Sequence, residues 1–87
     1  MSLATVVQLH TDLGKLAQKS PEHFAEPAMI EIYNANLADA KAQYPEDAVI
    51  VAMPEAKGQI RINDLLIRVG QMKATMQSNQ PILFGSV

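Results

Sequence analysis

Two residues of this sequence, His10 and Tyr33, could take part in acid–base or ligand chemistry. His10 lies in a run that repeats apolar residues at helical spacing, and an imidazole titrates near neutral pH. It could be a ligand or a general base, although a histidine on an apolar helix face is more often a hydrogen-bonded boundary residue. Tyr33 lies on the apolar face of a second helical run. Together, His10 and Tyr33 define a candidate ligand pocket inside a helical bundle.

The second histidine provides only half of a metal site. His23 and Glu26 are three residues apart and could share a helical face with Glu22. The sequence has no second Glu-x-x-His pair, and Pro27 follows directly. It also contains no glycine-rich phosphate loop and no recognisable Ser/His/Asp arrangement. We therefore predict no catalytic residue, no metal and no cofactor, and a protein that is not an enzyme.

Composition and charge place the chain among small globular proteins. Its 87 residues are 48% hydrophobic and 18% charged, and there is no cysteine for disulfides or thiolate metal sites. No apolar run reaches the ~18 residues of a membrane helix, and no signal peptide is recognisable, so we expect a cytoplasmic protein. The formal net charge is −2, and no contiguous basic stripe could bind the phosphates of a nucleic acid.

Two segments have a helical pattern in the first half of the chain. Residues 3–19 place their apolar side chains on one side at 100° per residue, with the charged ones opposite. Pro27 suits the first turn of a second helix, which continues to about Tyr44 because Pro45 disfavours its extension.

The third helix has the clearest pattern. Its polar positions are spaced 3, 4, 3 and 4 residues apart, as expected for a helix but not for a strand: Arg61, Asp64, Arg68, Gln71 and Thr75. A broad apolar face flanks this stripe: Ile62, Leu65, Leu66, Val69, Met72 and Met76. We expect this face to pack against the other two helices, with "QIRI" (residues 59–62) as the first turn of a central helix.

A second apolar seam on the third helix has no evident partner within so small a chain. It consists of Ile60, Ile67 and Ala74, seven residues apart. We predict that this seam binds a protein, either a second copy of the chain or another partner. Residues 79–87 form a separate C-terminal tail, which is too apolar to stay in water without a free-energy cost. We expect the tail to dock either on the bundle or on a neighbouring copy, the alternative being a frayed terminus. Its apolar side chains are expected to join the same partner surface: Ile82, Leu83 and Phe84.

Residues 46–53 are ambiguous, because a six-residue apolar run has too few positions to show a period. We favour a short helix capped near Asp47. The alternatives are an extended segment, or a β-hairpin over residues 48–62 that would make the fold α+β. The stretch LADAKAQYPEDAVIVAM, residues 37–53, resembles the junction between two tetratricopeptide repeats, although no 34-residue period follows. This resemblance implies helix–turn–helix packing.

The sequence thus predicts one all-α domain over residues 1–78, a small three-helix bundle with a short corner at 46–53. The function that we favour is a non-enzymatic protein–protein interaction or assembly module, which self-associates through the third helix. The alternative is a regulatory helical domain that binds a small molecule near His10 and Tyr33. An exposed apolar patch would favour the first function, and a cavity lined by those two residues would favour the second.

Overall fold

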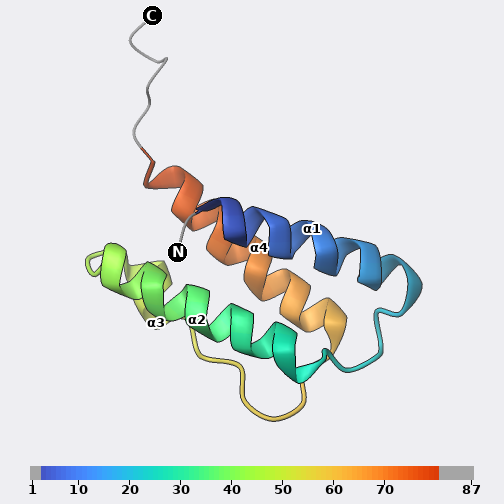
Figure 1. The fold of residues 1–87 in the computed structure, drawn as a ribbon. Coiled ribbons are helices and arrows are strands. Elements are labelled where there is room, and N and C mark those ends of the chain that lie inside the picture. The colour runs from blue at the N-terminus through green and yellow to red at the C-terminus, as the bar shows by residue number, and fades with distance from the viewer. Residues whose placement is uncertain (1–2, 81–87) are drawn as a thin grey trace, which may run out of the picture.

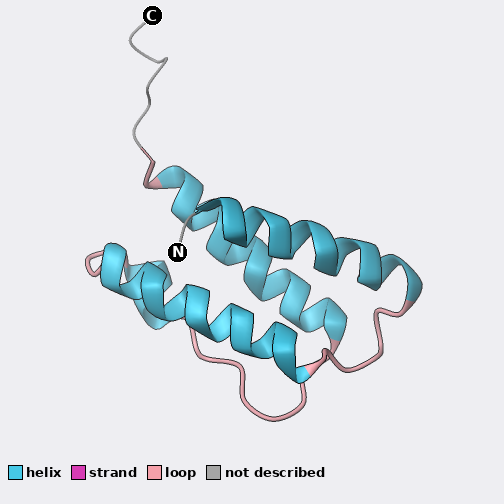
Figure 2. Ribbon diagram, viewed as in Figure 1, coloured by secondary structure: helices cyan, strands magenta, loops and turns pink. Residues whose placement is uncertain are grey.

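The computed structural model describes residues 3–80, and these form four helices (Figures 1 and 2). They are α1 (Leu3–Lys19), α2 (Pro27–Gln43), α3 (Ala48–Ala52) and α4 (Ile62–Ser78). The prediction of an all-α bundle is confirmed. Between residues 3 and 80 there is no strand, only one isolated bridge, so the β-hairpin over residues 48–62 does not form.

Helix α4 is the centre of the bundle. It packs against α1, α2 and α3, and its contact with α1 is the most extensive in the molecule. Figure 1 shows α1 running antiparallel to both α2 and α4, with the short α3 beside the C-terminal end of α2. The central position predicted for the last helix is therefore correct.

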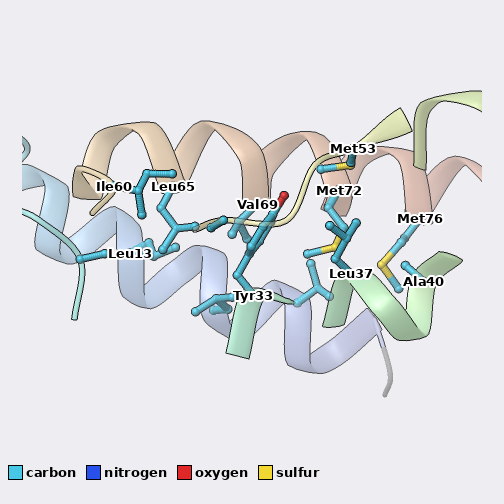
Figure 3. Packing of buried hydrophobic residues seen from close by; sticks show 14 of the residues in the cluster. Leu13, Tyr33, Leu37, Ala40, Met53, Ile60, Leu65, Val69, Met72 and Met76 are labelled. Atoms are coloured by element: carbon cyan, nitrogen blue, oxygen red, sulfur yellow. The ribbon is translucent and has the colours of Figure 1, made fainter. Parts of the chain in front are cut away.

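The core is built from one face of each helix (Figure 3). Because the buried positions of the long helices are spaced three or four residues apart, each helix turns a single apolar face inward. From α4 these are the residues expected from the sequence: Ile62, Leu65, Val69, Met72 and Met76. The side chains that meet them from the other helices include Val6, Leu9, Leu13, Leu37, Ala40 and Ile50.

The start of α4 differs from the prediction. The helix begins at Ile62, and its backbone N–H donates to the carbonyl of His23 at 2.8 Å. The Ile60 carbonyl accepts from Ala25 N–H at 2.7 Å, and Arg61 forms the isolated bridge with Phe24. Residues 59–61 are extended because their backbone pairs with residues 23–25. The prediction that "QIRI" forms the first helical turn is therefore wrong.

The ambiguous run at 48–53 is a helix over Ala48–Ala52, which ends at Met53. Asp47 Oδ1 accepts hydrogen bonds from the backbone N–H groups of Val49 at 2.9 Å and Ile50 at 3.1 Å, which is an ordinary N-cap. The favoured interpretation, a short helix capped near Asp47, is confirmed. Only Ile50 of this five-residue helix is buried, whereas Val49 and Val51 are exposed.

The connection from α3 to α4, residues 53–61, crosses the bundle without regular structure and is held by two side chains of α2. The Tyr33 hydroxyl donates to the carbonyl of Pro54 at 3.0 Å. Asn34 makes two bonds with Ala56: its amide N–H donates to the carbonyl at 2.9 Å, and its amide oxygen accepts from the N–H at 2.8 Å. Since Ala56 is only 4% exposed, Asn34 satisfies backbone groups that water reaches poorly.

We expect Asn34→Ala to lower the free energy of unfolding by about 2 kcal/mol, because it leaves both backbone groups of Ala56 without partners. Urea denaturation measures this change. Asn63→Ala, at an exposed position on α4, is the matched control and should have little effect. Equal losses in the two variants would contradict the role given to Asn34.

The Asp47 cap should make stability depend on acid pH. The hydrogen bond from Asn79, at 2.7 Å, and those from Ile50 and Val49 lower the pKa of Asp47 below its ordinary value of 3.8. These bonds therefore stabilise the fold fully above the ordinary pKa, and this stabilisation is lost as the pH falls through the folded-state pKa.

Asp47→Ala should accordingly lower the melting temperature at neutral pH, and its difference from wild type should shrink below pH 3.8. Thermal unfolding across this range is the measurement. The neighbouring exposed Glu46→Ala is the control and should follow wild type. A difference for Asp47→Ala that persists unchanged into strong acid would count against the cap.

Candidate functional site

His10 is part of the interface between α1 and α4. Its side chain is partly buried and lies against Gly70: a Cβ atom added to Gly70 would be only 3.2 Å from His10 Nε2. The imidazole thus fills the space that a residue without a side chain leaves open on α4. This placement is that of a boundary histidine between packed helices.

Tyr33 is in the core, away from solvent. Its side chain is 0% exposed, and its hydroxyl already donates to Pro54. Burial raises the pKa of Tyr33, and the nearby Arg68 guanidinium partly offsets this rise. Neither His10 nor Tyr33 lines any of the five most prominent surface hollows of residues 3–80. The structure therefore does not bring the two residues together in a pocket.

The half metal site suggested by His23 lies at an end of the bundle. His23 and Glu26 line the same hollow as Leu16, Phe24 and Met29. Within residues 3–80, no group of three or more histidine, aspartate or glutamate side chains is placed to hold a metal ion.

The three residues of the predicted seam do not lie on one helix, because α4 begins only at Ile62. Ile60 precedes the helix and is only 9% exposed, so it belongs to the core and not to a partner surface. Ile67 is 62% exposed, the largest value among the large apolar side chains of residues 3–80, and Ala74 is also exposed. The remaining predicted partner residues lie outside the described residues: Ile82, Leu83 and Phe84.

The exposed apolar surface of α4 continues onto α3. Gln71, one helical turn after Ile67, lines a hollow whose other residues come from α3 and the connection after it: Ala48, Val49, Ala52, Met53 and Pro54. Val49 is 43% exposed there. We call this surface the α3–α4 patch and define it by Val49, Ala52, Ile67, Gln71 and Ala74. Its members from α3 were missed in the sequence, because a continuous apolar run does not show which residues face solvent.

A second exposed group, around Phe24, was also missed. Phe24 is 46% exposed, and the Arg61 guanidinium lies over its ring, 4.8 Å from the centroid. Arg61 also donates to the backbone carbonyl of Glu22, so it joins residues 22–24 to the start of α4. The neighbouring hollow contains side chains of both signs, including Lys57 and Asp64. Such a cation–π contact stabilises the turn and does not by itself indicate a ligand.

Asn36 is the buried polar residue of residues 3–80. It is 1% exposed, and its amide N–H donates to the carbonyl of Ile32 at 2.8 Å. Its Oδ1 has no hydrogen-bond partner among the residues described. A buried acceptor without a partner costs about 1–3 kcal/mol, so Asn36 lowers the stability of the core.

The comparisons with known proteins identify no relative. No family model, no curated protein and no solved structure matches the chain. Among the helices of residues 3–80, none is both long and apolar enough to cross a bilayer. The function must therefore be argued from the surfaces described above.

The burial of Tyr33 can be tested by titration. The chain has two tyrosines, so Tyr44→Phe leaves Tyr33 as the single phenol. In the folded variant, tyrosinate absorbance should rise at a higher pH than in the same variant unfolded in urea, because burial raises the folded-state pKa above 10.0.

The raised pKa also sets the sign of the effect on stability. The stabilising effect of the neutral phenol is complete below the unfolded pKa and is lost as the pH rises through the folded pKa. A Tyr33 phenol that titrates at the same pH in both states would show that it is open to solvent, as a ligand pocket requires.

Proposed function

We propose that this chain is a non-enzymatic protein–protein interaction module that self-associates through the α3–α4 patch. The exposure of Ile67 is the observation that carries the proposal. An isoleucine that is 62% exposed on the outward side of the central helix gains free energy when a partner covers it, at roughly 25 cal/mol per Å² of apolar surface. Val49 and Ala52 extend the same surface beyond a single side chain.

The α3–α4 patch also has little charge that would resist burial. Its five defining residues are uncharged, and the charged residues of α4 nearest to Ile67 are Asp64 and Arg68 at the edge of this face. Interface cores are depleted of charged residues, since a buried unpaired charge loses its hydration. A cytoplasmic location is part of the same proposal and is supported by the absence of cysteine.

The alternative, a small-molecule regulatory domain, has less support. It needs a polar pocket near His10 and Tyr33, but the Tyr33 hydroxyl is hydrogen-bonded to Pro54 and His10 packs on Gly70. Neither side chain has a free polar face toward a described hollow.

Light scattering over a dilution series tests the proposal. The wild-type chain should show a mass above that of one chain at high concentration, and Ile67→Glu should reduce it to one chain while helicity is retained. Ile32→Glu is the matched control: Ile32 is an exposed isoleucine, 43% exposed, on α2, and its replacement should not alter the mass.

Two results would contradict the proposal. Wild-type protein that stays a single chain at every concentration would exclude self-association. Loss of helicity in Ile67→Glu but not in Ile32→Glu would show that Ile67 is a core residue and not part of a partner surface.

A further inference from the structure

The C-terminal end of α4 is attached to the start of α3 by side-chain hydrogen bonds. The Asn79 amide donates to Asp47 Oδ2 at 2.7 Å, and the other oxygen of this carboxylate caps α3. The Gln80 amide donates to the Tyr44 hydroxyl, just before α3, at 2.8 Å. The described part of the chain therefore ends beside α3, and residue 81 must start from there.

The sequence that follows α4, PILFGSV (residues 81–87), contains no charge and three consecutive large apolar residues: Ile82, Leu83 and Phe84. Pro81 disfavours a continuation of α4, because proline lacks a backbone N–H and disfavours the helical conformation of the residue before it. At 3.3–3.6 Å per residue, the Cα of Phe84 is within about 14 Å of the Cα of Gln80. Residues 82–84 can therefore reach only the surface around the end of α4.

Helix α3 offers exposed apolar side chains within this reach. Val49 and Val51 are 43% and 49% exposed, and the whole helix is only about 7.5 Å long, at 1.5 Å per residue. The backbone N–H of Val49 donates to the same Asp47 carboxylate that binds Asn79. No charged residue lines the hollow beside Val49, which is formed by Ala48, Val49, Ala52, Met53, Pro54 and Gln71.

The other exposed large apolar side chains of residues 3–80 are farther away. Ile67 is about 20 Å from the end of the described chain along α4, and Ile32 is about 18 Å from Tyr44 along α2. Leu16 and Phe24 line the same hollow as the first residue of α4, at the opposite end of that helix. The two valines of α3 are thus the exposed apolar side chains closest to the start of residues 81–87.

We infer that residues 82–84 pack onto the outward face of α3 of their own chain, in the hollow beside Val49. Both surfaces are apolar, so the contact removes apolar area from water without the cost of burying a charge. Because residues 82–84 are joined to α4 next to this hollow, their effective concentration there is on the order of mM, which favours docking within one chain over docking on a second copy.

This contact would regulate access to the α3–α4 patch. Residues 82–84 would cover Val49 and Ala52 and leave Ile67 exposed. A partner that binds the whole patch would then have to displace them from α3. Docking of residues 82–84 within one chain does not depend on self-association, so it stands or falls separately from the proposed function.

Methyl NMR of the full chain tests the contact. In the variant Ile82→Ser/Leu83→Ser/Phe84→Ser, the methyl resonances of Val49 should shift relative to wild type, because the apolar side chains and the aromatic ring that pack on Val49 are lost. The Ile32 and Ile67 methyl resonances should not move. The Val49 shift should be the same at every dilution.

Disulfide formation provides a second test, because the chain has no cysteine of its own. On mild oxidation in dilute solution, Val49→Cys/Leu83→Cys should close a disulfide within one chain roughly tenfold faster than Ile32→Cys/Leu83→Cys. The second variant is the matched control, since Ile32 and Val49 are both 43% exposed.

Three results would overturn the inference. Unchanged Val49 methyl resonances, with equal oxidation rates in the two cysteine variants, would show that residues 82–84 do not dock on α3. Shifts at Ile67 in place of Val49 would place them on α4. A Val49 shift that grows with protein concentration, or disulfides that form mainly between chains, would show that a second copy supplies them.

Discussion

The fold depends on how the chain crosses from α3 to α4. Residues 53–61 cross the bundle without regular structure and bury Met53, Ala56 and Ile60, so their backbone polar groups need partners other than water. Asn34 provides two of them at Ala56, and the pairing of Ala25 with Ile60 provides another. This polar anchoring determines where α4 starts, and it places Ile60 in the core instead of on the outward side of the helix.

The anchoring of residues 53–61 also shapes the α3–α4 patch, the surface that we assign to a partner. Because α4 begins at Ile62, Ile60 turns into the core, while Ile67 remains on the outer side with Gln71 and Ala74. Helix α3 is too short to cover this side: it contributes Ile50 to the core and leaves Val49 exposed. An uncharged surface therefore remains exposed on α4. Because α1, α2 and α3 all pack against this helix, the surface is held rigidly, as an interaction surface requires.

Sequence and structure agree best where an apolar face is long. The 3, 4, 3, 4 spacing of α4 is sustained over four turns, so its buried residues could be predicted one by one. They disagree at residues 59–61, where the helical spacing that begins at Arg61 predicts a first turn over "QIRI" but the backbone is extended. The pairing of these residues with 23–25 joins segments more than 30 positions apart, and no local pattern reports such a contact. The same distinction applies to the α3–α4 patch. Its residues Ile67 and Ala74 could be predicted from their helical spacing, whereas Val49 and Ala52 could not.

By itself, the sequence determined the helical class, the approximate positions of the long helices and the inward face of α4, and it favoured a cap at Asp47 without deciding it. These properties depend on local periodicity, proline positions and hydrogen bonds between near neighbours in the chain. Only the tertiary structure decided that His10 fills the space above Gly70, that Tyr33 is closed off by Pro54, and that Ile60 is core while Ile67 is surface. Each of these depends on which distant segment lies against the residue, and burial is a property of that pairing rather than of the residue itself.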